Sequence, residues 1–227
     1  REEGGMTDRP ILFSGPMVRA VLSGRKTQTR RVVKPQFFVQ VADVRLNASG
    51  EWCGHANGEP GIRRGWRRCP YGAPGERLWC RETWRPVMES WRGYVEYAAG
   101  GENLNVTSDR LESLRRLALR FPGARKDRHS EAWRPSIHMP RWASRLTLEV
   151  LGVRVGRLQA ITEEDARAEG IPRNDIGRFL PPYPNTAGWM HALDAFPGWW
   201  DAITGRRPGC SWEANPWVWV VSFRRLP

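Results

Sequence analysis

The sequence predicts an α+β protein in which a small mixed β-barrel carries short helices at its mouth and two long insertions interrupt the chain. Apolar segments are short and alternate with polar residues, as half-buried strands do. Long connections rich in Gly, Pro and Arg separate these segments. A few short segments have helix-capping residues at their ends. Together these features favour a small barrel with helices at its mouth over a layered or all-helical fold.

The N-terminal part predicts a strand, a short helix and a second strand. Residues 11–13 form a β-type run, and Pro16 occupies the first turn of a helix over 17–23 that ends at Gly24. Residues 29–33 alternate and include β-branched side chains, which favour a strand.

Two insertions, at about 37–70 and 88–135, are predicted within a single domain over residues 6–227. The first has little periodicity, so we expect an irregular loop. A compact strand at 78–84 separates the two. The second contains one helix, over residues 108–121.

The C-terminal part predicts two strands, 145–157 and 217–223, with two helices between them, 162–169 and 188–195. Thr162 is expected to cap the first of these helices. Asp165, three residues on, is expected to bond back to the backbone, as in a capping box.

The sequence predicts a cytoplasmic location. Residues 1–5 precede Met6 and are expected to lie upstream of the fold. Apolar runs stay below the roughly 18–20 residues that span a bilayer, and no signal-peptide pattern follows the basic start, so no membrane partner is expected. Four scattered cysteines do not resemble a disulfide framework and are expected to be reduced: Cys53, Cys69, Cys80 and Cys210.

The net charge of +12 and the pI near 10.6 favour a polyanionic partner, because Lys and Arg gain affinity by releasing the counterions of phosphates. Thirteen tryptophans add flat surfaces on which bases can stack. The alternative is a solvated basic surface. Only Lys26, Lys34 and Lys126 are lysines among 36 basic residues, so a lysine is itself informative, since an ammonium can lose its proton when desolvated and guanidinium cannot.

The segment Gly24-Arg25-Lys26-Thr27-Gln28-Thr29-Arg30 resembles the Gly-x-Lys-x-x-Thr-x-Arg signature of the ASCH family, which is related to PUA RNA-binding domains. Pro74-Gly75-Glu76-Arg77-Leu78-Trp79 is similar to its Gly-Asp-x-Leu turn, with Glu76 where the family usually has Asp. Residues 161–169 resemble its Thr-Glu-x-x-Ala-x-x-Glu helix, and 217–223 its closing strand. The match runs from about residue 11 to 223, and parts of it further resemble larger phage and prophage members.

The resemblance implies a PUA-like barrel and, from one branch of the family, hydrolysis of N4-acetylcytidine by a Lys, a Thr and a Glu. These fall on Lys26, Thr29 and Glu169, and Arg30 completes the signature as a candidate substrate-binding residue. Neutral Lys26 would take the hydroxyl proton of Thr29, whose oxygen attacks the amide carbonyl. The alternative is a solvated Lys and a Thr that satisfies a turn.

Glu169 is predicted in the last turn of its helix, immediately before Gly170. A carboxylate there opposes the helix dipole at a cost of about 0.3–1 kcal/mol. Functional sites are where such local conflicts collect. The alternative is an exposed acid or one paired with Arg173.

Other residues are candidates for substrate binding. Glu82 and Trp84 share one face of a strand and could read a base, the carboxylate by accepting from an amine and the indole by stacking. The alternative is a structural ion pair under a core tryptophan. Tyr71 is a weaker candidate. Arg141 and Trp142, with Arg145 nearby, suit a phosphate path or, alternatively, an amphipathic strand edge.

No metal or other cofactor is expected, because Cys53, His55 and Cys69 lack a clear fourth zinc ligand. The sequence therefore predicts a metal-independent amidohydrolase that removes the N4-acyl group from N4-acetylcytidine or a related acylated cytosine nucleoside or nucleobase. The alternative is a non-catalytic module that binds RNA, single-stranded or modified nucleic acid, and a ribonuclease ranks third.

Overall fold

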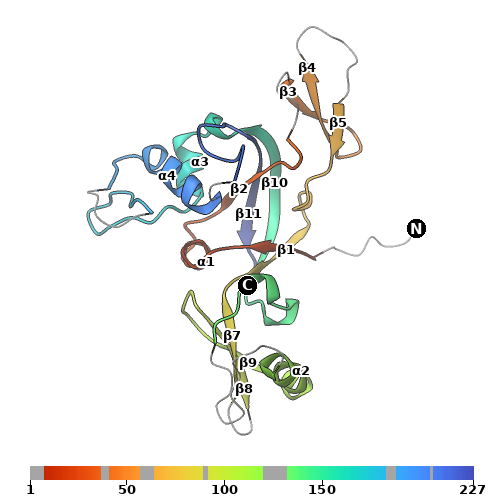
Figure 1. Ribbon diagram of the computed structural model, residues 1–227, viewed down its shortest axis with the longest axis vertical. Helices are drawn as coiled ribbons and strands as arrows, with labels where there is room; N and C mark the ends of the chain where they lie inside the picture. The colour runs from red at the N-terminus through yellow and green to blue at the C-terminus, as the bar shows by residue number, and fades with distance from the viewer. Residues whose placement is uncertain are drawn as a thin grey trace.

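The computed structural model describes residues 8–36, 41–56, 64–88, 92–119, 132–182, 188–204 and 207–227. It confirms an α+β fold built on a central five-stranded sheet (Figure 1). The strand order is β1 (Asp8–Leu12), β6 (Arg77–Arg81), β10 (Thr147–Arg157), β11 (Trp217–Arg225) and β2 (Gln28–Val32). The β1 and β6 strands are parallel, and the other neighbours are antiparallel.

The closing strand β11 is buried on both faces, which explains its nearly continuous apolar sequence. Trp219 and Val221 belong to the core that also contains residues of β1, β6 and β10. Val218 and Val220 point to the other side and pack in a second core formed with the helices. The strand therefore separates the two main cores of the molecule.

The sheet of the described residues does not close into a barrel. Its edge strands β1 and β2 have no ladder between them. Arg31 of β2 bridges part of this gap, because its Nη2 donates to the carbonyl oxygen of Leu12 in β1 at 2.6 Å. A side chain thus connects the two edges where a barrel would have backbone pairing.

Three helices pack around the central sheet (Figure 1): α1 (Gly15–Leu22), α3 (Glu163–Ala168) and α4 (Ala192–Thr204). The sequence predicted a helix over 188–195, whereas α4 begins at Ala192 and continues past Pro197. Phe196 and Trp200, one turn apart, are both buried in the second core, and this burial favours continuation. The Glu163 carboxylate also accepts from the backbone N–H groups of Ala192 and Leu193, at 3.0 and 2.9 Å, and so satisfies the start of α4.

The first insertion is not the irregular loop that the sequence predicted. It contains a three-stranded antiparallel sheet of β3 (Val41–Leu46), β4 (Trp52–Ala56) and β5 (Arg64–Arg67). Asn47 closes the first hairpin, since its side-chain oxygen accepts from Glu51 N at 2.8 Å. Trp52 packs edge-on against Trp219 of the central sheet, with ring centroids 6.3 Å apart. Packing against the central sheet thus accompanies strands in the first insertion that its weak sequence periodicity did not indicate.

The second insertion forms a separate small unit with its own core. Its strands are β7 (Trp84–Met88), β8 (Gly93–Tyr97) and β9 (Leu104–Val106), and they pack against α2 (Ser108–Leu119). The predicted helix is confirmed over the described residues; 120 and 121 lie outside them. The predicted strand 78–84 divides between β6 and β7 at Glu82 and Thr83. Short 3-10 turns at Ser136–His138, Arg141–Ala143 and Leu158–Ala160 complete the chain.

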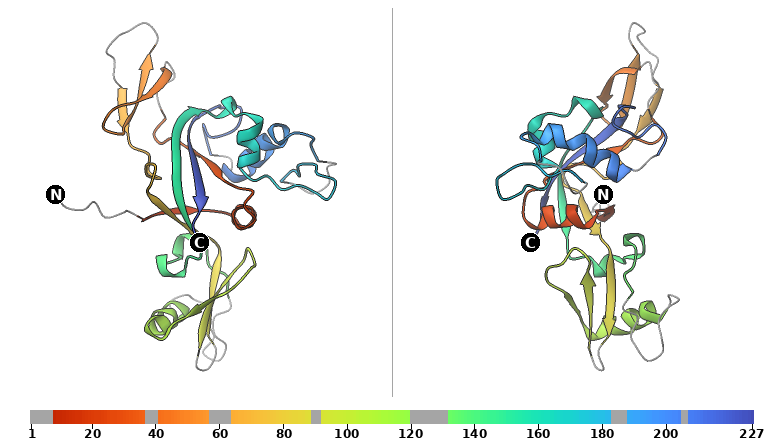
Figure 2. Two further views of the ribbon diagram at one scale, coloured as in Figure 1. Left: turned by 180° about the vertical axis from the view of Figure 1, so that it is seen from behind. Right: turned by 60° about the vertical axis from the view of Figure 1, so that its left-hand side comes forward.

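The two insertions lie at opposite ends of the molecule in all views (Figures 1 and 2). The helices in the described ranges include none that is long and apolar enough to cross a membrane.

Candidate active site

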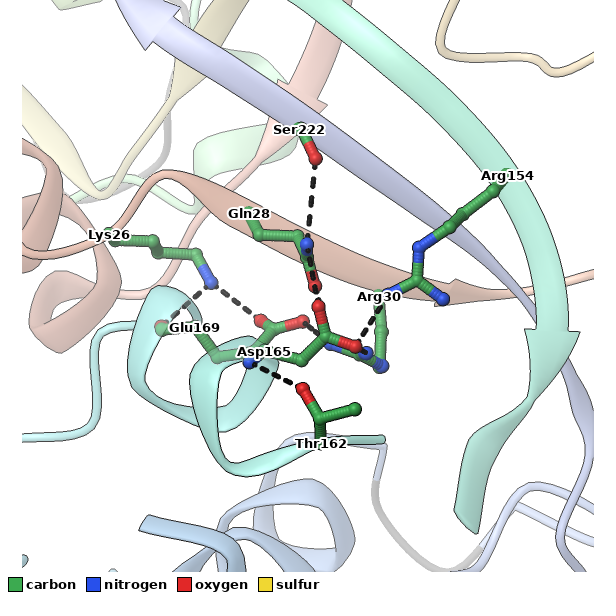
Figure 3. Close-up of polar contacts among 8 residues, drawn as sticks. All are labelled: Lys26, Gln28, Arg30, Arg154, Thr162, Asp165, Glu169 and Ser222. Carbon is green, nitrogen blue, oxygen red and sulfur yellow. Dashed lines mark hydrogen bonds and ion pairs between the residues drawn. The ribbon is translucent and has the colours of Figure 1, made fainter. Parts of the chain in front are cut away.

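The structure brings Lys26 and Glu169 into direct contact (Figure 3). The Lys26 Nζ donates to Glu169 Oε2 at 2.7 Å and to the Glu169 carbonyl oxygen at 2.9 Å. The two side chains are 0% and 7% exposed. A buried lysine and a nearly buried carboxylate therefore form one unit, although 143 residues separate them in sequence.

The contact explains why a carboxylate is tolerated at the end of α3. Glu169 is the C-cap residue of that helix. Lys26 places a positive charge against both its carbonyl and its side chain, and Thr27 N donates to the carbonyl of Ala168 at 2.9 Å. A cation at a helix C-terminus complements the dipole, so the local conflict in the sequence is compensated across the fold.

Gly170 makes this close approach possible. Its φ of +79° lies in the left-handed region. A Cβ at this position would lie 2.7 Å from Lys26 Cβ and 2.9 Å from Ala20 Cβ. Only glycine lets the end of α3 lie directly against the Lys26 segment.

A polar network extends from Glu169 along one face of β2 (Figure 3). Arg30 donates to Glu169 Oε1 at 3.2 Å, to Asp165 Oδ2 at 2.6 Å and to Gln28 Oε1 at 2.7 Å. Gln28 in turn donates to Asp165 Oδ1 at 3.1 Å, and Arg154 also pairs with Asp165. Arg30 is therefore a positioning group that fixes the Glu169 carboxylate.

Half of the expected capping box is present at the start of α3. The Thr162 hydroxyl accepts from Asp165 N at 3.2 Å, as predicted. The Asp165 side chain does not return to the backbone, because Arg30, Arg154 and Gln28 occupy its oxygens. Charged partners are stronger than a neutral backbone N–H.

Burial lowers the pKa of Lys26 below its ordinary value of 10.5, although the Glu169 carboxylate opposes this change. Burial also acts to raise the pKa of Asp165, but Arg154 and Arg30 outweigh it, and the pKa is lowered overall. The site thus contains a lysine that loses its proton more readily than usual beside an aspartate that stays ionised.

Thr29 lies on the opposite face of β2 from Gln28 and Arg30, as strand alternation requires. It is buried, and its hydroxyl has no hydrogen-bond partner. Lys26 borders this face as well, since its Nζ lies 5.7 Å from the centroid of Phe13, and Arg31, two residues beyond Thr29, lies 5.5 Å from the same ring. The structure shows no bond between Lys26 and Thr29.

A cavity of about 790 Å³ lies against this network. Glu169 and Arg30 reach its wall, and so does the predicted Tyr71. Burial raises the pKa of the Tyr71 phenol, with Arg31 opposing. Much of the remaining wall is aromatic: Phe196, Trp199, Trp200 and Trp219. The indole N–H groups of Trp199 and Trp200 donate to backbone carbonyls at 2.7 Å, which holds both rings in place. Lys26 and Thr29 are not part of the lining.

Glu82 and Trp84 lie away from this cavity, with structural contacts. Arg145 forms two bonds of 2.9 Å with the Glu82 carboxylate and stacks 4.0 Å from the centroid of Tyr97. Trp84 is fully buried in the core of the second insertion. This arrangement corresponds to the structural alternative, an ion pair beside a core tryptophan. Base recognition by either residue would require the insertion core to open.

Arg141 and Trp142 also lie outside the cavity lining. Arg141 forms an exposed ion pair with Asp8 at 2.8 Å. Trp142 packs against the core of the second insertion. The predicted group with Arg145 is therefore divided between a surface pair and a core contact.

The described residues contain only part of the candidate zinc-ligand set. In the described ranges, no group of three or more His, Cys, Asp or Glu side chains could hold a metal ion. Cys53 and Cys69 are buried, and burial raises the pKa of Cys69 to about 11. The side chain of His55 falls outside the part that the structure describes.

Sequence reasoning expected tryptophans on which bases can stack but did not identify the residues of the aromatic wall, and it missed the roles of Gln28, Asp165 and Arg154 in the network. A signal for the wall existed, because Phe196, Trp199 and Trp200 follow the i, i+3, i+4 spacing of one helix face. Pro197 and Gly198 concealed it. The network residues carried no local signal, since their partners lie far away in sequence.

Comparisons with protein-family models, with curated proteins and with solved structures gave no match for this chain.

Proposed function

We propose that this chain hydrolyses the amide bond of an N4-acylated cytosine, as the resemblance to the ASCH family and its PUA-like fold implies. One observation carries the proposal: a buried lysine with a lowered pKa touches a carboxylate that reaches an aromatic cavity. A desolvated lysine beside a cleft suits a general base.

The cavity suits a planar base. Its volume of about 790 Å³ falls within the usual range of ligand pockets, about 300–1,000 Å³. Tryptophan and phenylalanine side chains offer faces on which a pyrimidine can stack. The Glu169 carboxylate at the wall offers an acceptor for the amide N–H of the substrate. These features favour a neutral aromatic amide as the reacting group.

In the proposed reaction, neutral Lys26 takes the hydroxyl proton of Thr29, and the Thr29 oxygen attacks the acyl carbon. The C–N4 bond breaks, N4 receives the proton from Lys26, and an ester on Thr29 remains. Water then hydrolyses this ester to release the acid and restore Thr29. The unpartnered Thr29 hydroxyl supports this role. Lys26 must turn from Glu169 to reach it.

The rival mechanism uses Glu169 to activate water directly. The position of Glu169 on the cavity wall supports it, because Thr29 does not line the cavity. Both mechanisms give the same products. They differ in whether an acyl group is ever bonded to the protein.

The test is incubation of the purified protein with N4-acetylcytidine, followed by chromatography for cytidine. Thr29→Val and Glu169→Gln serve as variants, with thermal melting to check that the fold is retained. Mass spectrometry of rapidly quenched protein distinguishes the mechanisms: an acetyl adduct on Thr29 supports the nucleophile, and turnover by Thr29→Val supports water. Absence of cytidine release by the wild-type protein contradicts the function.

A second candidate, binding of RNA without catalysis, is favoured by the cations around the same cavity: Arg31, Lys34, Arg67, Arg68 and Arg207. Binding to single-stranded RNA should then weaken steeply as salt rises, because counterion release drives it. Filter binding or fluorescence anisotropy across a salt series measures this. Failure to bind at low ionic strength would leave the charge as a solvated surface.

A further inference from the structure

The charge of the cavity wall is unbalanced. Among the described residues that line it, six side chains are cationic and Glu169 is the single carboxylate. The cations are Arg30, Arg31, Lys34, Arg67, Arg68 and Arg207. A neutral nucleoside needs no such excess.

Several arginines elsewhere in the molecule pair with acids. Exposed pairs include Arg141 with Asp8 and Arg224 with Glu149, at 2.8 and 2.6 Å. By contrast, no carboxylate in the described part of the chain pairs with Arg31, Lys34 or Arg207. Lining cations are thus left available for an anion that enters the cavity.

Arg31 is the most informative of these cations. It is half-buried, its Nη2 donates to the Leu12 carbonyl at 2.6 Å, and its buried Nε has no partner. Burial lowers the pKa of its guanidinium. Glu169 acts on this charge electrostatically but forms no ion pair with it, and a desolvated charge without a direct counter-ion costs free energy unless a ligand pairs with it. The position is therefore best explained by an anionic ligand.

Three separate segments supply the cations of the wall. Arg31 and Lys34 come from β2 and the residues after it, Arg207 follows α4, and Arg68 follows β5 of the first insertion. Arg68 is only weakly held, by Glu51 at 3.5 Å, with its side chain 73% exposed. The first insertion therefore contributes directly to the cavity.

We propose that the cavity contains a phosphate subsite, so that the acylated base is recognised as part of a phosphorylated ribonucleoside rather than as a free nucleoside. This inference rests on the proposed function for the base, but the subsite is a separate binding element. Arg31, Lys34, Arg68 and Arg207 hold the phosphate group, with the first insertion completing the wall. The phosphate belongs either to a mononucleotide or to an RNA chain, and both present the same ester chemistry.

The test is isothermal titration calorimetry with the products, which separates binding from catalysis. The ligands are cytidine, 5′-CMP, 3′-CMP and a cytidine-containing RNA pentamer. Charge-assisted hydrogen bonds to phosphate are expected to make one of the CMP isomers bind at least about tenfold more tightly than cytidine. If the pentamer binds more tightly than the better CMP isomer, the subsite is supported and the phosphate belongs to a polymer. If the pentamer and that CMP isomer bind equally, and both bind more tightly than cytidine, the subsite is supported and the phosphate belongs to a mononucleotide.

Two variants locate the subsite. Lys34→Gln and Arg207→Gln should each weaken CMP binding by about three- to tenfold and leave cytidine binding within about twofold. Arg115→Gln, an exposed arginine of α2 outside the cavity, is the matched control for loss of one charge. Equal affinities for cytidine and CMP overturn the inference, as do variants that behave like Arg115→Gln.

The outcomes separate this inference from the proposed function. Preferential CMP binding without any acyl hydrolysis supports the phosphate subsite and contradicts the proposed hydrolase function. Hydrolysis of N4-acetylcytidine, together with equal affinities for CMP and cytidine, supports the hydrolase function and contradicts the phosphate subsite. Failure of every ligand to bind contradicts the phosphate subsite, and the assay for cytidine release alone decides the proposed hydrolysis.

Discussion

The central sheet and the second insertion each bury a carboxylate against a cation, and the two pairs differ in what they can do. Beside β2 of the central sheet, Glu169 at the end of α3 divides its oxygens between Lys26 and Arg30 and reaches a cavity. At the second insertion, both oxygens of Glu82 are bound by one guanidinium, that of Arg145. Arginine does not lose its proton at accessible pH, whereas a desolvated lysine can. Similar burial therefore surrounds a lysine of lowered pKa in one region and a guanidinium that keeps its proton in the other.

The largest expected effect comes from Lys26→Arg. If Lys26 is the general base, the change should lower amide hydrolysis by about 10²–10⁴-fold, because guanidinium cannot accept the proton. Steady-state kinetics with N4-acetylcytidine measures it, and thermal melting checks that the larger side chain fits beside Gly170.

The matched control is Arg145→Lys, the reverse exchange in the other pair. It should leave hydrolysis unchanged. Near wild-type turnover by Lys26→Arg excludes Lys26 as the base and favours Glu169 acting on water.

Arg145→Ala tests the structural side of the comparison. Removing one partner leaves Glu82 buried without its counter-ion, which should cost about 3–5 kcal/mol in the free energy of unfolding. Urea denaturation measures it. Arg141→Ala, which breaks the exposed pair with Asp8, is the control and should cost about 0.2–1 kcal/mol. Similar losses for both variants would contradict a special role for the buried pair.

Gly170→Ala tests the close contact that holds Lys26 against α3. Backbone strain and the new Cβ near Lys26 Cβ should together cost about 1–3 kcal/mol in stability and reduce hydrolysis. Gly177→Ala has a similar φ of +80° but no atom within 4 Å of the new Cβ, so it pays the backbone cost alone. The difference between the two variants, in denaturation and in activity, isolates the Lys26 contact. No difference would mean that the contact is unimportant.

The smallest expected effect is the pH dependence, at up to about tenfold in kcat/KM per pH unit. Because the pKa of Lys26 is lowered, the active neutral amine forms as pH rises through a value below 10.5, so activity should rise and then level off. The same sign holds for stability: the unfolded chain binds the proton that the folded chain releases, so stability also rises with pH in that window.

Glu169→Gln sharpens this prediction. The Glu169 carboxylate raises the pKa of Lys26 against the effect of burial. Its removal should therefore move the rising limb, which is the pH range over which kcat/KM increases, to lower pH in any residual activity. Glu82, whose pKa burial raises, titrates outside the cavity, so Glu82→Gln should leave the limb in place. A limb that does not move in Glu169→Gln would mean that another group controls the profile.

Local sequence alone determined several elements of this protein. The strands around residues 29–33, 145–157 and 217–223 and the helix α2 follow from alternation and helical spacing, which act between near neighbours. Thr162 as a cap was readable for the same reason, since it bonds three residues along the chain. The approach of Lys26 to Glu169 was suggested only by a family resemblance, and the geometry now shows the contact itself.

Only the tertiary structure decided the rest, because the deciding partners are distant in sequence. The sheet of the described residues is open between β1 and β2. The first insertion forms strands, and its Trp52 packs on Trp219 of the central sheet. The tertiary structure extended α4 past Pro197, where burial of Phe196 and Trp200 outweighs the local penalty. It also gave two buried carboxylates different partners, for Glu82 a guanidinium in a closed core and for Glu169 a lysine beside a cavity. Burial and the identity of the partner set the pKa values and access of these groups, and neither is encoded within a few residues of the chain.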